Sequence, residues 1–305
     1  MNVSVHFHTL LAHFLPSPIL TAKGERHLIR LDDGDQIAGY LHAGTSDYVV
    51  SLFHGLTGDS DADYMQRTAI LYLAKGHSVF LVNHRGVDPA AGPTKEPYHS
   101  GRGEDISQVI GYLRKLMPSK KQIAVGFSMS GNMVLFLLAG RKGTELPDGA
   151  ITVNAPINLQ ACSILLGQGF NRVYDLRFVR RLISRYEIKL SRWSKLIEVD
   201  DKFTAPLSGF KSGQEYYDIC SSKPHVQNIQ VPTQVMAAED DPFIPAQDYR
   251  EAAWPANVEV KIHPRGGHLG YMLANKNEFG NRRGLDSHMV ENLDKLIRKI
   301  EVPKG

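Results

Sequence analysis

The chain has 305 residues, of which 42% are hydrophobic, so it can bury a large core in one enlarged domain or two small ones. Its formal net charge of +3 is small for this length and gives no support to nucleic-acid binding. Two cysteines, Cys162 and Cys220, argue against a disulfide framework and suit a reducing compartment, with a single bridge left open. Met1–Leu15 lacks the basic start of a secretory signal, and no apolar run could span a bilayer. We therefore expect a soluble, cytoplasmic globular protein.

The first elements along the chain are a hairpin, a strand and a helix. Segment 27–42 predicts a β-hairpin that turns at Asp33-Gly34. Segment 48–53 predicts a buried strand. The helix that follows can be capped by Asp61 or Asp63, and Gly76 can end it.

Strands and helices then continue to alternate as far as Pro156. The apolar patterns predict strands over 79–82, 123–125 and 150–153, with helices over 106–116 and 133–138. Short apolar strands that alternate with helices are typical of a mostly parallel sheet covered by helices on both faces. We therefore predict an α/β fold of this kind.

The alternation stops after Pro156 and resumes near residue 233. Strands are predicted over 233–237 and 258–262, and a closing helix over 290–297. We expect a single domain whose core comprises residues 1–156 and 227–305. Residues 157–226 are expected to form a helical cap insertion over the carboxyl ends of the strands, where open α/β sheets place their sites.

Ser128 lies in the segment Gly126-Phe127-Ser128-Met129-Ser130-Gly131, between a predicted strand and a predicted helix. A nucleophile elbow needs small residues around its serine, because the sharp turn crowds the neighbouring Cβ atoms. The segment reads G-x-S-x-S and departs from G-x-S-x-G at Ser130, although Gly131 follows at once. Taken alone, it would also fit an ordinary loop, and its position between strand and helix favours the elbow.

A nucleophilic serine needs a base, and the base needs a carboxylate to orient it. The candidate base is His268, between glycines after the last predicted strand, with His263 as the alternative. The candidate acid is Asp241, in the loop after the preceding strand. Asp240 is its alternative, and an acidic turn or helix cap is the non-catalytic interpretation.

An oxyanion needs backbone N–H donors near the serine. The candidates are Met129, which follows the serine, and Leu56, in the glycine-rich loop after the third strand, although an ordinary turn fits that loop nearly as well. The sequence contains no H-E-x-x-H motif, no Cys/His cluster and no G-x-G-x-x-G motif after a strand. We therefore expect neither a zinc site nor a dinucleotide-binding motif, and we interpret both cysteines as structural.

These motifs resemble the α/β-hydrolase family, and more narrowly its YheT-like branch of carboxylesterase-type proteins. The resemblance implies the chain order serine, aspartate, histidine, with Ser128 activated by His268 and Asp241 and no cofactor. The resemblance defines no substrate; from the candidate residues we expect a serine hydrolase that cleaves short- to medium-chain carboxylic esters through an acyl-enzyme. The narrower resemblance extends from about residue 50 to 270 and rests on motifs that include His54-Gly55-Leu56-x-Gly58, Asn83-His84-Arg85-Gly86, Asn154-Ala155-Pro156, Tyr216-Tyr217-x-x-Cys220-Ser221 and Gly266-Gly267-His268.

The segment from Arg172 to Lys195 carries eight basic and two acidic residues, with apolar residues at helical spacing through Trp193. It predicts an amphipathic helix. We favour simple packing of its apolar face over an interpretation in which it attracts anionic lipid and lines an acyl pocket. The expected partner is a small-molecule ester, not nucleic acid. Thioester or lipid acyl hydrolysis on the same residues, or a non-catalytic binding role, are the alternatives.

Overall fold

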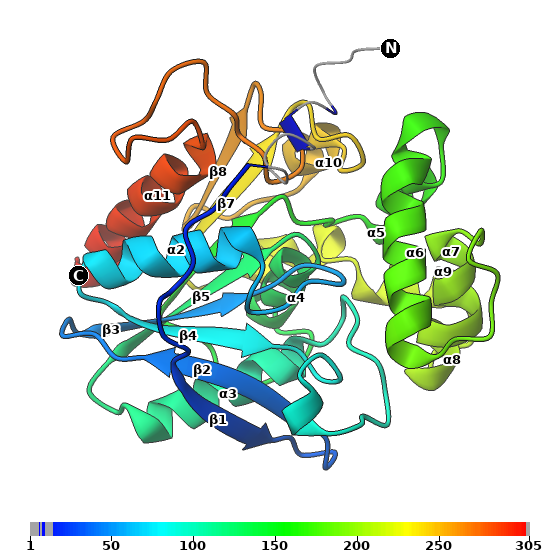
Figure 1. Ribbon diagram of the computed structural model, residues 1–305, viewed down its shortest axis with the longest axis horizontal. Coiled ribbons are helices and arrows are strands. Elements are labelled where there is room, and N and C mark those ends of the chain that lie inside the picture. The colour runs from blue at the N-terminus through cyan, green and yellow to red at the C-terminus, as the bar shows by residue number, and fades with distance from the viewer. Residues whose placement is uncertain (1–5, 7, 10–14, 303–305) are drawn as a thin grey trace.

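A computed structural model describes residues 6, 8, 9 and 15–302 of the chain. Most of the segment 1–15, for which the sequence predicts no secretory signal, therefore lies outside the described residues. Within them, an eight-stranded sheet has the strand order β1-β2-β4-β3-β5-β6-β7-β8 (Figure 1). Its strands are β1 (Glu25–Arg30), β2 (Gln36–His42), β3 (Tyr48–Phe53), β4 (Ser78–Asn83), β5 (Lys121–Phe127), β6 (Gly149–Val153), β7 (Thr233–Ala238) and β8 (Val258–His263).

The sheet is mixed but mostly parallel, as the sequence predicts. β1 and β2 form the expected antiparallel hairpin, with Ile29 opposite Ile37 and a turn at Gly34, whose φ of 91° suits glycine. β2 also pairs antiparallel with β4, whereas every pair from β4 to β8 is parallel. The parallel strands thus direct their carboxyl ends to one edge of the sheet.

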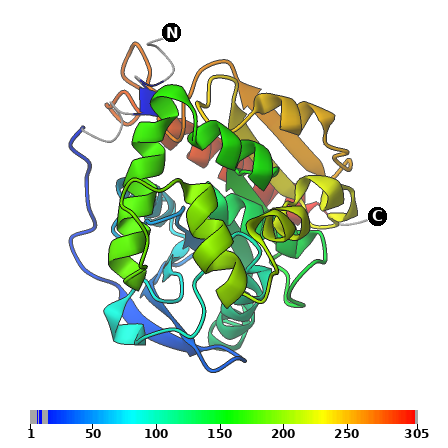
Figure 2. The same cartoon turned by 90° about the vertical axis from the view of Figure 1, so that its right-hand side faces the viewer.

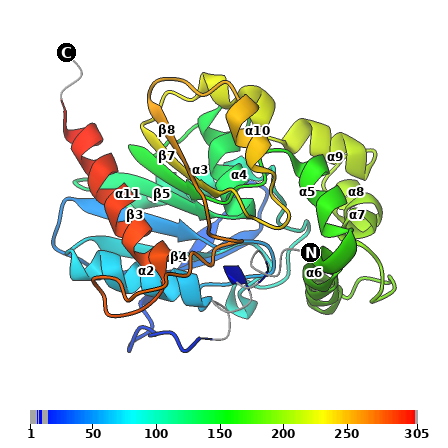
Figure 3. The same ribbon diagram turned by 90° about the horizontal axis from the view of Figure 1, so that it is seen from above.

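Helices cover both faces of the sheet (Figures 1 and 3). Successive residues of β3 show the two sides: Val49 packs in one hydrophobic cluster and Val50 in the other. Both side chains are fully buried, which explains why this strand is apolar throughout. One face carries α2 (Asp63–Ala74) and α11 (Gly284–Glu301); the other carries α3 (Gly103–Leu116), α4 (Met129–Leu138) and α10 (Ala246–Glu251).

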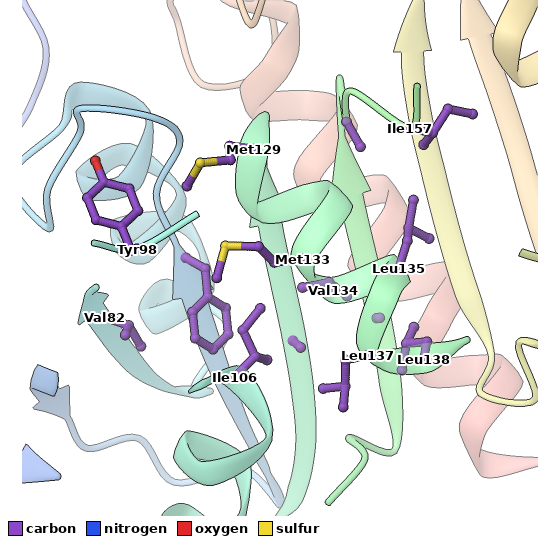
Figure 4. Packing of buried hydrophobic residues seen from close by; sticks show 14 of the residues in the cluster. Val82, Tyr98, Ile106, Met129, Met133, Val134, Leu135, Leu137, Leu138 and Ile157 are labelled. Carbon is purple, nitrogen blue, oxygen red and sulfur yellow. The ribbon is translucent and has the colours of Figure 1, made fainter. Parts of the chain in front are cut away.

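Helix α4 is buried along its whole length, since it lies between the sheet and α3. Met133 and Leu137 of α4 pack with Ile106 of α3 in the same cluster (Figure 4). Burial on all sides explains why the helix has no polar face. It also holds the first residue of α4, Met129, in a fixed position beside Ser128.

The expected acidic cap of α2 is wrong. Neither Asp61 nor Asp63 is the N-cap of the helix: that position is held by Ala62, which makes no side-chain cap bond, although Oδ1 of Asp63 accepts from the backbone N–H of Tyr64 at 2.8 Å. Asp63 is the first helical residue, and its Oδ2 accepts a 2.8 Å hydrogen bond from Arg67 one turn later. The carboxylate is therefore engaged with Arg67. The predicted end holds, because α2 stops at Ala74 and Gly76 follows with φ 83°.

Between β6 and β7 the chain forms only helices and loops, here called the helical insertion (157–226; Figure 2). The predicted amphipathic helix ends earlier than expected, at Tyr186, because Glu187 adopts a left-handed φ of 52°. Trp193 therefore lies outside it, and its side chain is 66% exposed. The helices are α5 (Leu159–Leu166), η2 (Gly169–Asn171), α6 (Arg172–Tyr186), α7 (Leu196–Val199), the π-helix η3 (Asp200–Thr204), α8 (Ala205–Leu207), α9 (Gly213–Cys220) and η4 (Lys223–Asn228); one further 3₁₀ turn, η1 (Pro89–Ala91), follows β4.

Candidate active site

Ser128 occupies a sharp turn between β5 and α4. Its backbone has φ 53° and ψ −122°, a conformation that a non-glycine residue rarely adopts. The small neighbours are needed: a Cβ added at Gly126 would lie 2.4 Å from the carbonyl oxygen of Ser130, and one at Gly131 would lie 2.7 Å from the Cβ of Ala155. The turn leaves Ser128 partly exposed while the flanking residues are buried. This geometry is that of a nucleophile elbow.

Ser130 stands where the usual elbow has its second glycine, and its side chain is fully buried. Its hydroxyl donates a hydrogen bond to the carbonyl oxygen of His54 and lies 2.7 Å from Nε2 of His84. Because the hydroxyl proton goes to the carbonyl, Nε2 of His84 is the donor in the second contact. Ser130 thus ties the elbow to the loop that follows β3.

The structure brings His268 and Asp241 to Ser128. Nε2 of His268 lies 2.9 Å from Oγ of Ser128, and Nδ1 of His268 lies 2.8 Å from Oδ2 of Asp241. The Asp241 side chain is 1% exposed and that of His268 is 10% exposed. When Nδ1 carries the proton and donates to the carboxylate, Nε2 is free to accept the proton of the serine hydroxyl. Hydroxyl, imidazole and carboxylate therefore form one continuous hydrogen-bonded relay.

The two alternatives from the sequence have other contacts. Oδ1 of Asp240 accepts hydrogen bonds from the backbone N–H groups of Gly266 at 2.6 Å and Gly267 at 2.7 Å. Asp240 thus fixes the glycine loop that leads into His268. His263 is the last residue of β8 and is buried. Its ring packs against that of His288, with the two centroids 4.0 Å apart. Asp241 is thus the carboxylate bonded to His268, and His268 is the imidazole that faces Ser128.

Asp241 is held by further donors. Its Oδ1 accepts from the backbone N–H groups of Phe243 and Ile244, both at 3.1 Å. The side-chain amide of Asn154 donates to Oδ2 at 2.6 Å, and Oδ1 of Asn154 accepts from the hydroxyl of Tyr271 at 2.6 Å. Asn154 is not among the site residues predicted from the sequence. Its position directly after β6, at the same sheet edge as the other site residues, is the signal that could have pointed to it.

The loop after β3 passes close to Ser128. A Cβ added at Gly55 would lie 3.0 Å from the Cβ of Ser128, so the two backbones are close. The amides on either side of Leu56 are occupied: Gly55 N–H donates to the Tyr64 hydroxyl at 2.9 Å and Thr57 N–H to the Tyr98 hydroxyl at 2.8 Å.

The amides of Leu56 and Met129 differ from these neighbours. Among the described residues, neither N–H donates to a protein acceptor. Both residues line the same cavity as Ser128. The arrangement therefore offers two unused backbone donors near the serine, which is what a developing oxyanion requires.

Two arginines of α6 hold the same loop from the helical insertion. Nη1 of Arg185 donates to the Tyr98 hydroxyl at 3.0 Å, and Nη1 of Arg181 donates to the carbonyl oxygen of Thr57 at 3.4 Å. Two of the basic side chains of this segment therefore bind groups of the protein itself. These contacts join residues more than eighty positions apart, which the sequence pattern could not indicate.

The buried histidines behind this loop are neutral. Burial lowers the pKa of His54 to about 4, and it also holds the pKa of His84 well below its usual range. Nδ1 of His54 faces the carbonyl oxygen of Gly55 at 2.8 Å, and its Nε2 accepts from the backbone N–H of His84. These bonds fix a tautomer with the proton on Nδ1, so His54 supports the loop and adds no charge to it.

Ser128 lines two cavities, and α6 contributes side chains to both. One is here called the apolar cavity, and α6 contributes Phe178, Leu182 and Tyr186 to its wall. The other, here called the polar cavity, also reaches His268. Its wall includes charged side chains, among them Asp59, Asp61, Asp63, Arg67 and Arg181. The apolar side of α6 therefore lines a cavity beside Ser128 as well as packing on the core.

The described residues carry no candidate metal-binding group, disulfide or membrane-spanning helix. Within the described ranges, no group of three or more His, Cys, Asp or Glu side chains could hold a metal ion. Cys162 and Cys220 are both buried and are not bonded to each other. In the part of the chain that the structure describes, no helix has the length and apolar character to cross a bilayer.

Fold and sequence comparisons agree on the family. Residues 48–194 match the family described as alpha/beta hydrolase fold, and the chain belongs to this family. It is 31% identical over 237 residues to the Escherichia coli protein named "Putative esterase YheT", which covers 72% of this chain and 69% of the relative. It is also 27% identical over 270 residues to the human "Phospholipase ABHD3", covering 83% of this chain and 66% of the relative.

Solved structures agree in fold at much lower sequence identity. The Pyrococcus furiosus esterase Pf2001 superposes with a TM-score of 0.63 at 14% identity, covering 92% of this chain and 97% of that one. The 2,6-dihydroxy-pseudo-oxynicotine hydrolase gives the same TM-score and identity, covering 99% of this chain and 74% of that one. These likenesses establish the α/β-hydrolase fold.

Proposed function

We propose that this protein is a serine hydrolase that cleaves carboxylic esters of short to medium acyl chains. The observation that carries the proposal is the relay from Asp241 through His268 to Ser128, with contacts of 2.8 and 2.9 Å. Relatives named as an esterase and a phospholipase support ester hydrolysis as the reaction class.

In the proposed reaction, Oγ of Ser128 attacks the ester carbonyl carbon while His268 takes the hydroxyl proton. Asp241 orients His268 and stabilises its protonated form. The N–H groups of Leu56 and Met129 donate to the oxyanion of the tetrahedral intermediate. His268 then gives the proton to the leaving alkoxide, and an acyl-enzyme remains on Ser128. Water activated by His268 releases the acid and regenerates the hydroxyl.

The helical insertion fits the proposed role of a cap. Residues 157–226 would cover the site of a core formed by residues 1–156 and 227–305. Phe178, Leu182 and Tyr186 of α6 line the apolar cavity beside Ser128, which suits an acyl chain. A cytoplasmic location stays a prediction from the sequence.

The test uses Ser128→Ala with an activated short-chain ester and a fluorophosphonate probe. We expect the wild type to hydrolyse the ester and to be labelled, and the variant to lose both while its circular dichroism and melting temperature stay close to those of the wild type. Ser287→Ala is the matched control, because it removes a serine hydroxyl that is bonded to Glu278 outside the site. Turnover retained in Ser128→Ala would refute the proposal, and a wild type that neither reacts nor turns over would favour a binding protein.

Lipid acyl hydrolysis is the second candidate. Six large apolar residues of the helical insertion are at least 40% exposed: Ile164, Phe170, Val173, Trp193, Leu207 and Ile219. Exposed apolar side chains beside basic ones suit contact with an anionic lipid surface. Co-sedimentation with anionic vesicles, weakened by salt, would support this candidate, and equal recovery with and without vesicles would exclude it.

A further inference from the structure

A polar cluster interrupts the otherwise apolar wall of the apolar cavity. It consists of Ser163 on α5, Asp200 and Thr204 on η3, and Tyr217 on α9, and all four line the cavity that also holds Ser128. These elements belong to the helical insertion, whereas Ser128 lies at the edge of the sheet (Figure 1). The cluster and the serine therefore occupy different walls of one cavity.

The hydrogen bonds of the cluster all run toward Asp200. Thr204 Oγ1 donates to Oδ1 of Asp200 at 2.9 Å, and the Tyr217 hydroxyl donates to Oδ2 at 2.8 Å. Because the proton of Tyr217 is committed to the carboxylate, Ser163 must donate in its 2.9 Å contact with Tyr217. The hydroxyl protons of the cluster are thus used internally. What the cluster can offer to a ligand is acceptor capacity, mainly the remaining lone pairs of the carboxylate.

The carboxylate also lacks a countercharge. Among the described residues that line the cavity, Asp200 is the one carboxylate, and none is lysine or arginine. Removal from water raises the pKa of Asp200 to about 6, so the group is mostly ionised at neutral pH. A buried charge without a partner is costly, and a hydrogen-bond donor or a cation relieves that cost.

We propose that the Ser163–Asp200–Thr204–Tyr217 cluster is a substrate subsite that binds a hydrogen-bond-donating group, a protonated amine or a hydroxyl, at the end of the substrate remote from the scissile ester. The inference rests on the proposed ester hydrolysis and refines its substrate class. A ligand carboxylate or phosphate is excluded at this position, because it would face Asp200 with like charge. Tyr98, Tyr186 and Phe203 line the same cavity, and their aromatic rings would also favour a cationic amine.

A structural role for Asp200 makes a different prediction. The carboxylate does tie η3 to α9, and through Tyr217 to α5. A purely structural carboxylate would affect every substrate alike. A subsite changes the ratio between substrates with and without a donor group.

The test measures that ratio. Para-nitrophenyl esters of ω-amino, ω-hydroxy and unsubstituted alkanoic acids are compared over a series of chain lengths, in the wild type, Asp200→Asn and Tyr217→Phe. At the matching length we expect kcat/KM of the wild type to be higher for a donor-bearing ester than for the plain one. The advantage should fall about tenfold or more in Asp200→Asn, as expected for a hydrogen bond to a charged group. Because each ratio is taken within one enzyme preparation, partial misfolding of a variant cancels.

The matched control is Asp218→Asn, which removes an exposed carboxylate of α9 and should leave every ratio unchanged. Competitive inhibition of the wild type gives a second measure: an alkylamine should compete with a plain ester, and an alkyl carboxylate of the same length should not. The inference is overturned if the plain ester is preferred at every length, or if the advantage survives Asp200→Asn. Absence of turnover with all three ester series would instead reject the proposed function itself.

Discussion

The side-chain amide of Asn154 donates to the same oxygen of Asp241 that faces the imidazole of His268. Asn154 is fully buried, and its backbone has a left-handed φ of 48°. The carboxylate of Asp241 and the carbonyl oxygen of Gly267 can only accept, so they fix the amide nitrogen as the atom that faces them. The hydroxyl of Tyr271 donates to the amide oxygen. Asn154 is therefore a positioning residue for the carboxylate in the proposed relay.

Asn154→Gly should lower kcat about tenfold and leave KM nearly unchanged. Glycine accepts the left-handed backbone, so the variant removes the amide without adding strain. Loss of one hydrogen bond to a carboxylate is worth roughly 1.5 kcal/mol, which corresponds to that factor. Steady-state kinetics on an activated ester checks it. Tyr271→Phe, which keeps the bond between Asn154 and Asp241, should cost less, and an equal loss in both variants would count against the positioning role.

The adjacent acids Asp240 and Asp241 should respond very differently to the same substitution. Asp241→Asn should reduce kcat by about 10⁴, because the amide cannot orient the imidazole in the required tautomer. Asp240→Asn should reduce it by less than about tenfold, since an amide oxygen can still accept from the N–H groups of Gly266 and Gly267. Single-turnover kinetics on the two variants gives the comparison. Similar losses would show that the roles of the two carboxylates are not separate.

Tyr98→Phe should lower kcat about tenfold through the loop that carries Leu56. The substitution leaves the buried N–H of Thr57 without its acceptor and removes a partner of Arg185. We expect the loop to shift and the Leu56 donor to bind the oxyanion less well. The control is Tyr40→Phe, which removes a tyrosine hydroxyl bonded to Asp88 outside the site. Unchanged kcat in Tyr98→Phe would mean that the loop keeps its position without this anchor.

The stability of the protein should fall as the pH drops from about 6.5 toward 4. Burial lowers the pKa of His54 to about 4, so between these values the unfolded chain binds a proton that the folded protein does not. His54 therefore contributes stability that is present above its unfolded pKa and is lost on acidification, up to about 3 kcal/mol. The pKa of His99 is likewise held low by burial, whereas the raised pKa of Asp200 acts in the opposite direction.

Urea unfolding at a series of pH values measures this effect. The difference in unfolding free energy between the wild type and His54→Gln isolates the contribution of His54, because the other groups titrate in both proteins. That difference should shrink as the pH falls from 7 to 4.5. A difference that stays constant over this range would contradict a neutral, buried His54.

Local patterns were sufficient to predict the elements that place Ser128 and His268. The strand before Ser128 and the helix after it are both buried, so their apolar character appears directly in the sequence. The glycines of the elbow are also visible there, because the close approaches at Gly126 and Gly131 tolerate no side chain. Elements that are buried along nearly their whole length are thus predictable from one sequence.

Contacts between distant segments could not be predicted in this way. Asp240 and Asp241 are adjacent acids, and their separate partners depend on the path of the 266–268 loop. Asn154 and Arg185 act across the fold, so nothing next to them in the sequence marks their partners. The end of α6 at Tyr186 could not be predicted, because the helical spacing of apolar residues continues beyond it.

Helix α6 lines both cavities, and this affects the order of events in the proposed turnover. Ser128 belongs to both walls, as does Phe178 of α6. An ester bound across the serine would have its acyl portion in one cavity and its alcohol portion in the other. The alcohol could then depart through its own exit while the acyl portion is still attached, and water would enter by the vacated route.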